Sequence, residues 1–235
     1  MKRAQIVDQQ TWLQKRLELL RAEKELTRLR DQLNAERRAM PWVQVEKDYR
    51  FQTEQGEQSL PELFAGRSQL VIQHFMYGPD WAEGCPSCSF WADNFSGTVV
   101  HLNHRDISFV AISRAPLDQL LAYRRRMGWE FPWASSLDSD FNFDFQASFS
   151  DEELAAGEVY YNFRNGTFPS SEAPGVSVFA KDANDNVFHT YSCYGRGLDI
   201  LNGTYHYMDL TPKGRDEAQL PWPMAWLRRH DQYED

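Results

Sequence analysis

The sequence Cys85-Pro86-Ser87-Cys88 most constrains the fold, because it separates a predicted buried strand from a predicted helix. Residues 69–77, QLVIQHFMY, form an apolar run that Gly78-Pro79 ends, which is typical of a buried strand. Residues 89–101 carry apolar side chains at helical spacing. We therefore expect Cys85 to cap a helix, with Pro86 at its first position, where the missing N–H costs nothing.

A Cys-x-x-Cys pair can be a redox dithiol, half of a zinc site or a disulfide staple. At a helix start the unpaired N–H groups and the helix dipole lower the pKa of Cys85 and favour its thiolate, the form that attacks disulfides. Cys88 lies one turn further on the same face and can displace the product. Asp80 and Glu83 precede Cys85 with no Lys or Arg nearby in sequence. Their carboxylates would raise the pKa of Cys85 if they pointed toward it.

A zinc site is the main metal alternative, because Cys85-x₂-Cys88-x₁₂-His101-x₂-His104 is close to a Cys₂His₂ spacing. If 89–101 is one helix, His101 lies roughly 20 Å along the axis from Cys88 at 1.5 Å per residue, too far for one metal ion. We therefore expect no metal and no cofactor, while a static disulfide staple stays open. Cys193, at the end of a predicted strand, is expected to be a buried free thiol, and a role as a third redox cysteine is the alternative.

Charge and targeting signals narrow the class of protein. The formal net charge is −9, and it is uneven, since residues 1–40 hold 10 Lys/Arg and 6 Asp/Glu against 15 and 28 in the remainder. An acidic body repels phosphate backbones, so we expect no nucleic-acid partner. The chain shows no signal peptide and no apolar run of transmembrane length, so no membrane partner is expected. With three cysteines, this indicates a cytoplasmic protein.

Residues 8–40 predict a long helical arm, since they are rich in Glu, Arg, Lys, Leu and Ala and contain no Gly or Pro before Pro41. Two short leucine stripes follow one another: Leu13, Leu17 and Leu20, then Leu26, Leu29 and Leu33. The shift between them does not sustain a heptad. The arm could join two copies of the chain in a homodimer or pack on its own domain, and the sequence favours neither.

The rest of the chain alternates between predicted strands and helices. The predicted strands are 42–51, 69–77, 107–112, a short one near 131–136, and a hairpin of 176–180 with 187–192; the predicted helices are 89–101, 116–127 and 197–207. This order predicts an α/β sheet with helices on both faces. We divide the chain into an arm (1–40), a main domain (41–220) with an insertion at about 138–172, and a C-terminal tail (221–235).

The strand before Cys85, the helix that opens at Cys85-Pro-Ser-Cys88, and Ala173-Pro174-Gly-Val-Ser-Val-Phe resemble a thioredoxin fold. More closely, the chain resembles a bacterial thioredoxin-like family of unknown function, domain-of-unknown-function family 899. The matching runs are Glu36-Arg-Arg-Ala-Met-Pro-Trp, Val45-Glu-Lys-Asp-Tyr-Arg-Phe, His74-Phe-Met-Tyr-Gly-Pro-Asp-Trp81, Gly84-Cys-Pro-Ser-Cys-Ser-Phe-Trp-Ala-Asp93, Ser113-Arg-Ala-Pro116, Gly197-Leu-Asp and Leu210-Thr-Pro-Lys-Gly-Arg-Asp216.

The resemblance implies a central mixed sheet flanked by helices. It also implies a thiol–disulfide oxidoreductase whose partner is a protein or small-molecule disulfide or thiol. Cys85 would be the nucleophile and Cys88 the resolving thiol. A cis-proline at Pro174 would begin the strand beside the pair, and Trp81, Pro86 and Pro174 would form the substrate groove. The resemblance implies no known substrate.

Two departures bear on the function. Thioredoxin itself has Cys-Gly-Pro-Cys, whereas here Pro86 comes first, as in glutaredoxin-like Cys-Pro-x-Cys, so the redox potential does not carry over. A peroxiredoxin site reads Pro-x-x-x-Thr/Ser-x-x-Cys, and Ala82 stands where its Thr/Ser would be, which disfavours peroxide reduction. A redox-inactive binding module that works through the arm and the 138–172 insertion is the alternative from another class.

Overall fold

The computed structural model describes residues 4–234, which divide between Pro41 and Trp42 into two compact units. The first unit contains one long helix, α1 (Gln9–Arg38). Asp8 caps it by accepting a hydrogen bond from the Thr11 N–H at 2.7 Å. No residue of α1 is buried. The predicted helix over 8–40 is confirmed, with its start and end each within two residues.

The second unit is built on a sheet of eight strands in the order β1-β10-β9-β4-β5-β6-β2-β3. Their bounds are β1 Val43–Gln44, β2 Arg50–Thr53, β3 Gly56–Ser59, β4 Gln69–His74, β5 Ile107–Ser113, β6 Trp133–Ser135, β9 Gly175–Lys181 and β10 Val187–Tyr194. β4 is parallel to β5 and antiparallel to β9. The sheet is therefore mixed, and the predicted α/β fold of thioredoxin-like arrangement is confirmed, with the dithiol directly after the central strand β4.

The helices of this unit are short. They are α2 Pro86–Ala92, α3 Ser96–His104, α4 Leu117–Arg126, α5 Phe141–Asp144, α6 Asp151–Ala156 and α7 Gly203–Asp209, with 3-10 turns η1 Glu62–Phe64, η2 Gly195–Leu201 and η3 His230–Gln232. The predicted helix over 89–101 is wrong in extent, since α2 and α3 are separate. Asn94 explains the break, because its side-chain amide donates to the carbonyls of Phe90 and Trp91 and competes with the helical ladder.

The single strand predicted over 42–51 is also wrong. Its first part, β1, pairs with β10 at one edge of the sheet, whereas its last part, β2, pairs with β3 and β6 near the opposite edge. The hairpin of β2 with β3 turns at Gly56, whose φ of 103° favours glycine. Alternation of apolar residues was compatible with one strand, but it does not report which neighbour each half pairs with.

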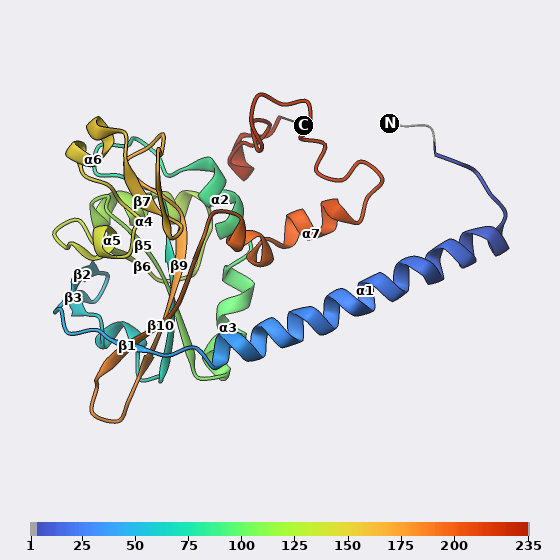
Figure 1. The fold of residues 1–235 in the computed structure, drawn as a ribbon. Coiled ribbons are helices and arrows are strands. Elements are labelled where there is room, and N and C mark those ends of the chain that lie inside the picture. The colour runs from blue at the N-terminus through green and yellow to red at the C-terminus, as the bar shows by residue number, and fades with distance from the viewer. Residues whose placement is uncertain (1–3, 235) are drawn as a thin grey trace. The chain divides into compact units, whose positions relative to one another are not determined.

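Side chains alternate between the two faces of the sheet, as the pleat requires. On β5, Phe109 and Ala111 belong to one buried cluster, and Val110 and Ile112 belong to another. The first cluster includes residues of α2 and α4, whereas the second includes residues of η1 and α5. Figure 1 shows α2 and α3 on the opposite side of the sheet from α5. The dithiol thus lies on the face of the first cluster.

The predicted insertion at about 138–172 contains α5, α6 and a separate hairpin, β7 (Val159–Tyr161) with β8 (Arg164–Gly166). Ser150 and Glu153 form a reciprocal capping box at the start of α6. Phe149, Val159 and Ala173 form a small core of their own. The segment is therefore an ordered layer that ends where β9 begins.

The peptide bond before Pro174 is trans, because no cis peptide bond occurs in residues 4–234. The predicted cis-proline is therefore wrong, and the bond has the isomer of lower energy for an X–Pro peptide. Pro174 still precedes β9 directly, as predicted. Within the described part of the chain, no helix combines the length and the apolar character needed to cross a membrane.

Candidate active site

The dithiol occupies the predicted place at a helix start. Cys85 is the N-cap of α2 and Pro86 is its first residue, so this local prediction is confirmed. The loop folds back on itself, since the Cys85 N–H donates to the Met76 carbonyl at 3.0 Å and the Met76 N–H donates to the Cys88 sulfur at 3.4 Å. Both cysteines are thiols, with Cys88 buried and Cys85 partly exposed. The segment that leaves β4 therefore fixes both positions.

The two thiols differ strongly in acidity. The Cys88 thiol donates a hydrogen bond to the Cys85 sulfur and, with the backbone N–H groups of Ser87 and Cys88, lowers the pKa of Cys85 from 9.0 to about 7, although burial opposes this shift. The same hydrogen bond and burial raise the pKa of Cys88. Near neutral pH the thiolate is therefore on Cys85, and Cys88 keeps its proton.

The carboxylate of Glu83, two residues before Cys85, is paired with two guanidinium groups. Arg229 lies 2.8 Å from one of its oxygens, and Arg126 bonds the other. Asp80 is exposed. Paired and solvated carboxylates act weakly on a neighbouring sulfur, so the two acidic residues do not hold back the Cys85 thiolate.

Arg229 also holds the backbone and the side chains around the dithiol. Its Nη2 donates to the Gly84 carbonyl and its Nε donates to the Tyr123 hydroxyl, each at 2.7 Å. The Tyr123 hydroxyl contacts the Ser89 hydroxyl at 2.9 Å, and the Ser89 hydroxyl donates to the Cys85 carbonyl at 2.9 Å. Sequence reasoning missed Arg229, which lies 145 residues after Gly84, and no motif around it signals the contact.

A cavity of about 560 Å³ borders the dithiol at Ser87 and Cys88. It is lined by Gln73, Met76, Ser87, Cys88, Trp91, Pro174, Gly195, Arg196, Leu198, Asp199, Tyr205, Asp209, Arg215, Glu217, Pro223 and Met224. Pro174 is thus brought to the dithiol, as predicted for a groove residue. Trp81 is not in this cavity, because it lines a separate hollow with Tyr77 and Arg126, and Pro86 is exposed.

Tyr161, from the insertion, fixes part of the cavity wall. Its hydroxyl donates to the Pro174 carbonyl at 2.8 Å and accepts from the Gly195 N–H at 3.0 Å. Burial raises its pKa, so the hydroxyl keeps its proton. The insertion therefore contributes to the site, a role that the sequence did not assign to any of its residues.

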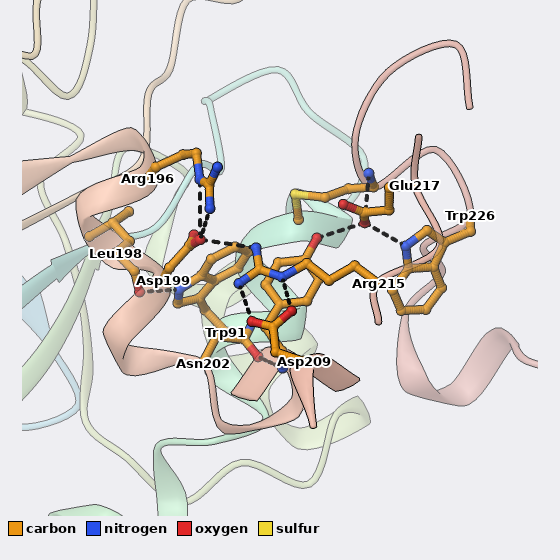
Figure 2. Close-up of polar contacts among 11 residues, drawn as sticks. Trp91, Arg196, Leu198, Asp199, Asn202, Asp209, Arg215, Glu217 and Trp226 are labelled. Carbon is orange, nitrogen blue, oxygen red and sulfur yellow. Dashed lines mark hydrogen bonds and ion pairs between the residues drawn. The ribbon is translucent and has the colours of Figure 1, made fainter. Parts of the chain in front are cut away.

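Charged side chains form a connected network along the cavity (Figure 2). The Arg215 guanidinium donates to both oxygens of Asp209 at 3.0 and 2.9 Å and to Asp199 at 3.0 Å, and it lies 3.9 Å from the centre of the Tyr205 ring. Arg196 also donates to Asp199. Bidentate pairing of this kind fixes both partners in one geometry.

Glu217 holds the C-terminal part of the chain against α7. One of its oxygens accepts hydrogen bonds from the Tyr205 hydroxyl at 2.8 Å, the Trp226 indole at 2.7 Å and the Met224 N–H at 3.0 Å. The Trp91 indole, on α2, donates to the Leu198 carbonyl at 2.8 Å. The cavity wall is therefore tied both to the dithiol helix and to the tail.

His74, His101, His104 and Cys193 are not among the residues that line the cavity. His74 is buried, its Nε2 lies 2.9 Å from the Ser177 hydroxyl, and burial lowers its pKa to about 3, so it is neutral. His101 and His104 lie on α3, and residues 4–234 contain no cluster of three or more His, Cys, Asp or Glu that could hold a metal. Cys193, on β10, is partly buried against the main core.

Comparison with known proteins identifies a family whose model matches nearly the whole chain. The family described as "Bacterial protein of unknown function (DUF899)" matches residues 1–233. Peroxiredoxin Q of Xanthomonas campestris has a TM-score of 0.45 at 13% identity, covering 65% of this chain and 86% of that one. Peroxidoxin BcpB of Mycobacterium tuberculosis has a TM-score of 0.46 at 14% identity, covering 70% and 95%. No curated protein matches.

Proposed function

The chain belongs to the DUF899 family of bacterial proteins of unknown function, and we propose that it is a thiol–disulfide oxidoreductase that uses Cys85 and Cys88. The observation that carries this proposal is the placement of two free thiols at the start of α2, with Cys85 at the N-cap and Cys88 buried within the first turn. A pKa of about 7 for Cys85 gives a large thiolate fraction at neutral pH. A structural staple or an inert pair has no need of this arrangement.

The reaction proceeds by two exchanges. The Cys85 thiolate attacks one sulfur of a substrate disulfide, a new sulfur–sulfur bond forms, and one substrate thiolate leaves. The negative charge on Cys85 is then gone, so the hydrogen bond that raised the pKa of Cys88 is lost and Cys88 can ionise. Its sulfur attacks Cys85 and releases the second substrate thiolate. The substrate gains two electrons and two protons, one from Cys88 and one from solvent.

We place substrate recognition at Pro174, beside Cys88, with Trp81 and Pro86 as contacts on the outer side of the dithiol. We further propose that the protein works in the cytoplasm, where a dithiol is kept reduced. α1 would join two copies of the chain, since most of its leucines, including Leu13 and Leu26, are exposed.

Reduction of insulin disulfides by the pre-reduced protein tests the proposal. The wild type should precipitate insulin in the presence of a thiol reductant well above the background of the reductant alone, and the Cys85→Ser variant should fall to that background. Cys193→Ser is the matched control and should keep wild-type activity. Equal rates for wild type and Cys85→Ser would reject the function. Peroxide consumption measured on the same proteins separates the peroxide-reductase alternative.

A further inference from the structure

The cavity beside Cys88 has the size of a small-molecule site. Its volume of about 560 Å³ lies within the ~300–1,000 Å³ typical of such pockets. Its walls combine apolar side chains, among them Met76, Trp91 and Leu198, with a few charged groups. Cys85 is the N-cap of the helical turn that carries Cys88, so a group attached to Cys85 through a disulfide begins beside this cavity. The wall thus includes one cysteine of the redox pair.

The charges of the cavity favour a cation. Three carboxylates, on Asp199, Asp209 and Glu217, line it against two guanidinium groups, on Arg196 and Arg215. Every nitrogen of Arg215 already donates to a carboxylate. The Arg196 and Asp209 side chains are 87% and 47% exposed, so solvent screens both charges. Asp199 and Glu217 then remain against Arg215, and the side chains of Asp199 and Arg215 are 17% and 20% exposed. The effective balance inside the cavity is therefore acidic.

Two carboxylates of the cavity each keep one oxygen that can accept further hydrogen bonds. Both guanidinium groups bond the same oxygen of Asp199, Oδ2, and all three donors to Glu217 bond Oε1. Within residues 4–234 the second oxygens, Asp199 Oδ1 and Glu217 Oε2, receive no hydrogen bond. A ligand that carries N–H donors and positive charge would use both oxygens.

We propose that this cavity binds the amine-bearing half of a small disulfide, so that the substrate is a low-molecular-weight disulfide with a protonated amino group near its sulfur. The inference rests on the proposed function for its redox step. The Cys85 thiolate attacks the near sulfur and releases the other half as a thiolate. The retained half lies in the cavity, with its ammonium group on Asp199 and Glu217, until Cys88 displaces it.

Single-turnover oxidation of the pre-reduced protein tests the substrate class. The probes are cystamine with two ammonium groups, dithiodipropionate with two carboxylates, and neutral hydroxyethyl disulfide. Each rate, followed by alkylation of the remaining thiols and mass spectrometry, is divided by the rate of the same disulfide with dithiothreitol, which removes intrinsic reactivity. We expect cystamine to exceed dithiodipropionate by about tenfold or more in normalised rate, with the neutral disulfide between them.

Glu217→Gln removes the charge and keeps an oxygen that can accept the same three hydrogen bonds. It should reduce the cystamine preference by about threefold or more, and Asp199→Asn should act in the same direction if Glu217→Gln does not fold. Asp216→Asn is the matched control, because this exposed neighbour does not line the cavity. An equal loss of preference in Asp216→Asn would assign the effect to the net charge and overturn the proposal.

The two proposals fail in different ways. If the wild type reduces insulin but oxidises with none of the three disulfides, the oxidoreductase function stands and the small-molecule substrate class is rejected. If it does neither, the oxidoreductase function itself is rejected. If all three react at equal normalised rates, or dithiodipropionate reacts fastest, the function stands and the amine-bearing substrate class is rejected.

Discussion

The two sides of the dithiol differ in how their charges are satisfied. On the side of Cys85, Glu83 is paired with two guanidinium groups, and Arg229 holds the Gly84 carbonyl. On the side of Cys88, a cavity keeps more carboxylates than guanidinium groups and leaves oxygens without donors in the described chain. Complete pairing fixes a nucleophile in place, whereas incomplete pairing leaves capacity to bind a ligand. The Cys85 side is therefore organised for reactivity, and the Cys88 side is organised for binding a ligand.

The largest effect on the redox reaction should come from replacing Cys88, the cysteine that lines the cavity. Cys88→Ser leaves Cys85 able to attack but removes the group that resolves the mixed disulfide. We expect the variant to accumulate a covalent adduct with cystamine, visible as an intact-mass increase that a reductant reverses, while the wild type ends as the internal disulfide. An adduct on Cys193 in place of Cys85, found by peptide mapping, would contradict the division of roles.

The pH dependence of alkylation tests the Cys85 side directly. Because the pKa of Cys85 is about 7, its reaction with iodoacetamide should rise about tenfold per pH unit below that value and level off above it. An ordinary thiol with a pKa of 9.0 would still be rising at pH 8. A midpoint near 9 would show that the helix start and Cys88 do not stabilise the thiolate.

Arg229→Gln should have a smaller effect that is confined to the Cys85 side. It leaves Glu83 with one cationic partner and frees the Gly84 carbonyl, so we expect the Cys85 pKa to rise by about one unit and alkylation at pH 7 to slow about threefold to tenfold. The pH dependence of alkylation by iodoacetamide measures this shift in the Cys85 pKa.

Arg228→Gln is the matched control, since Arg228 is exposed and its guanidinium bonds only the Leu227 carbonyl among the described residues. Neither substitution changes the other titratable or charged groups near Cys85, which are Cys88, Glu83, Arg126 and Tyr123. Identical profiles for both variants would assign Arg229 a structural role alone.

Deletion of residues 1–40 should have the smallest effect on the reactivity of Cys85 and on ligand preference in the cavity. The dithiol unit begins at Trp42, so the alkylation midpoint and the cystamine preference should stay within experimental error of the wild type. The mass measured by light scattering should halve if α1 joins two copies. An unchanged mass would reject α1 as the dimer contact, and a shifted midpoint would show that α1 acts on the site.

Local features of the site could be predicted from the sequence. Cys85, Pro86 and Cys88 lie within one helical turn, and the apolar strand before them is continuous, so their geometry follows from short-range rules. The alternating order of strands and helices likewise predicted an α/β sheet with helices on both faces. These inferences succeed because each depends on residues that are neighbours along the chain.

The contacts of Arg229 and Tyr161 could not be predicted in this way. Each joins the site from a distant segment, and an isolated arginine or tyrosine in a polar stretch carries no periodic signal. The prediction of one strand over 42–51 was wrong for a related reason. Strand pairing depends on partners such as β10 and β6, which lie far along the chain. Long-range pairing, rather than local propensity, limited the prediction.

The link between Arg229 and Gly84 has a consequence for biosynthesis. The ribosome adds Gly84 145 residues before Arg229, an interval of about 7–30 s at ~5–20 residues per second. During that time Glu83 lacks its partner Arg229, and the Gly84 carbonyl lacks its donor. We therefore expect a nascent chain to hold a weaker nucleophile than the finished protein, which limits disulfide exchange with other chains during translation.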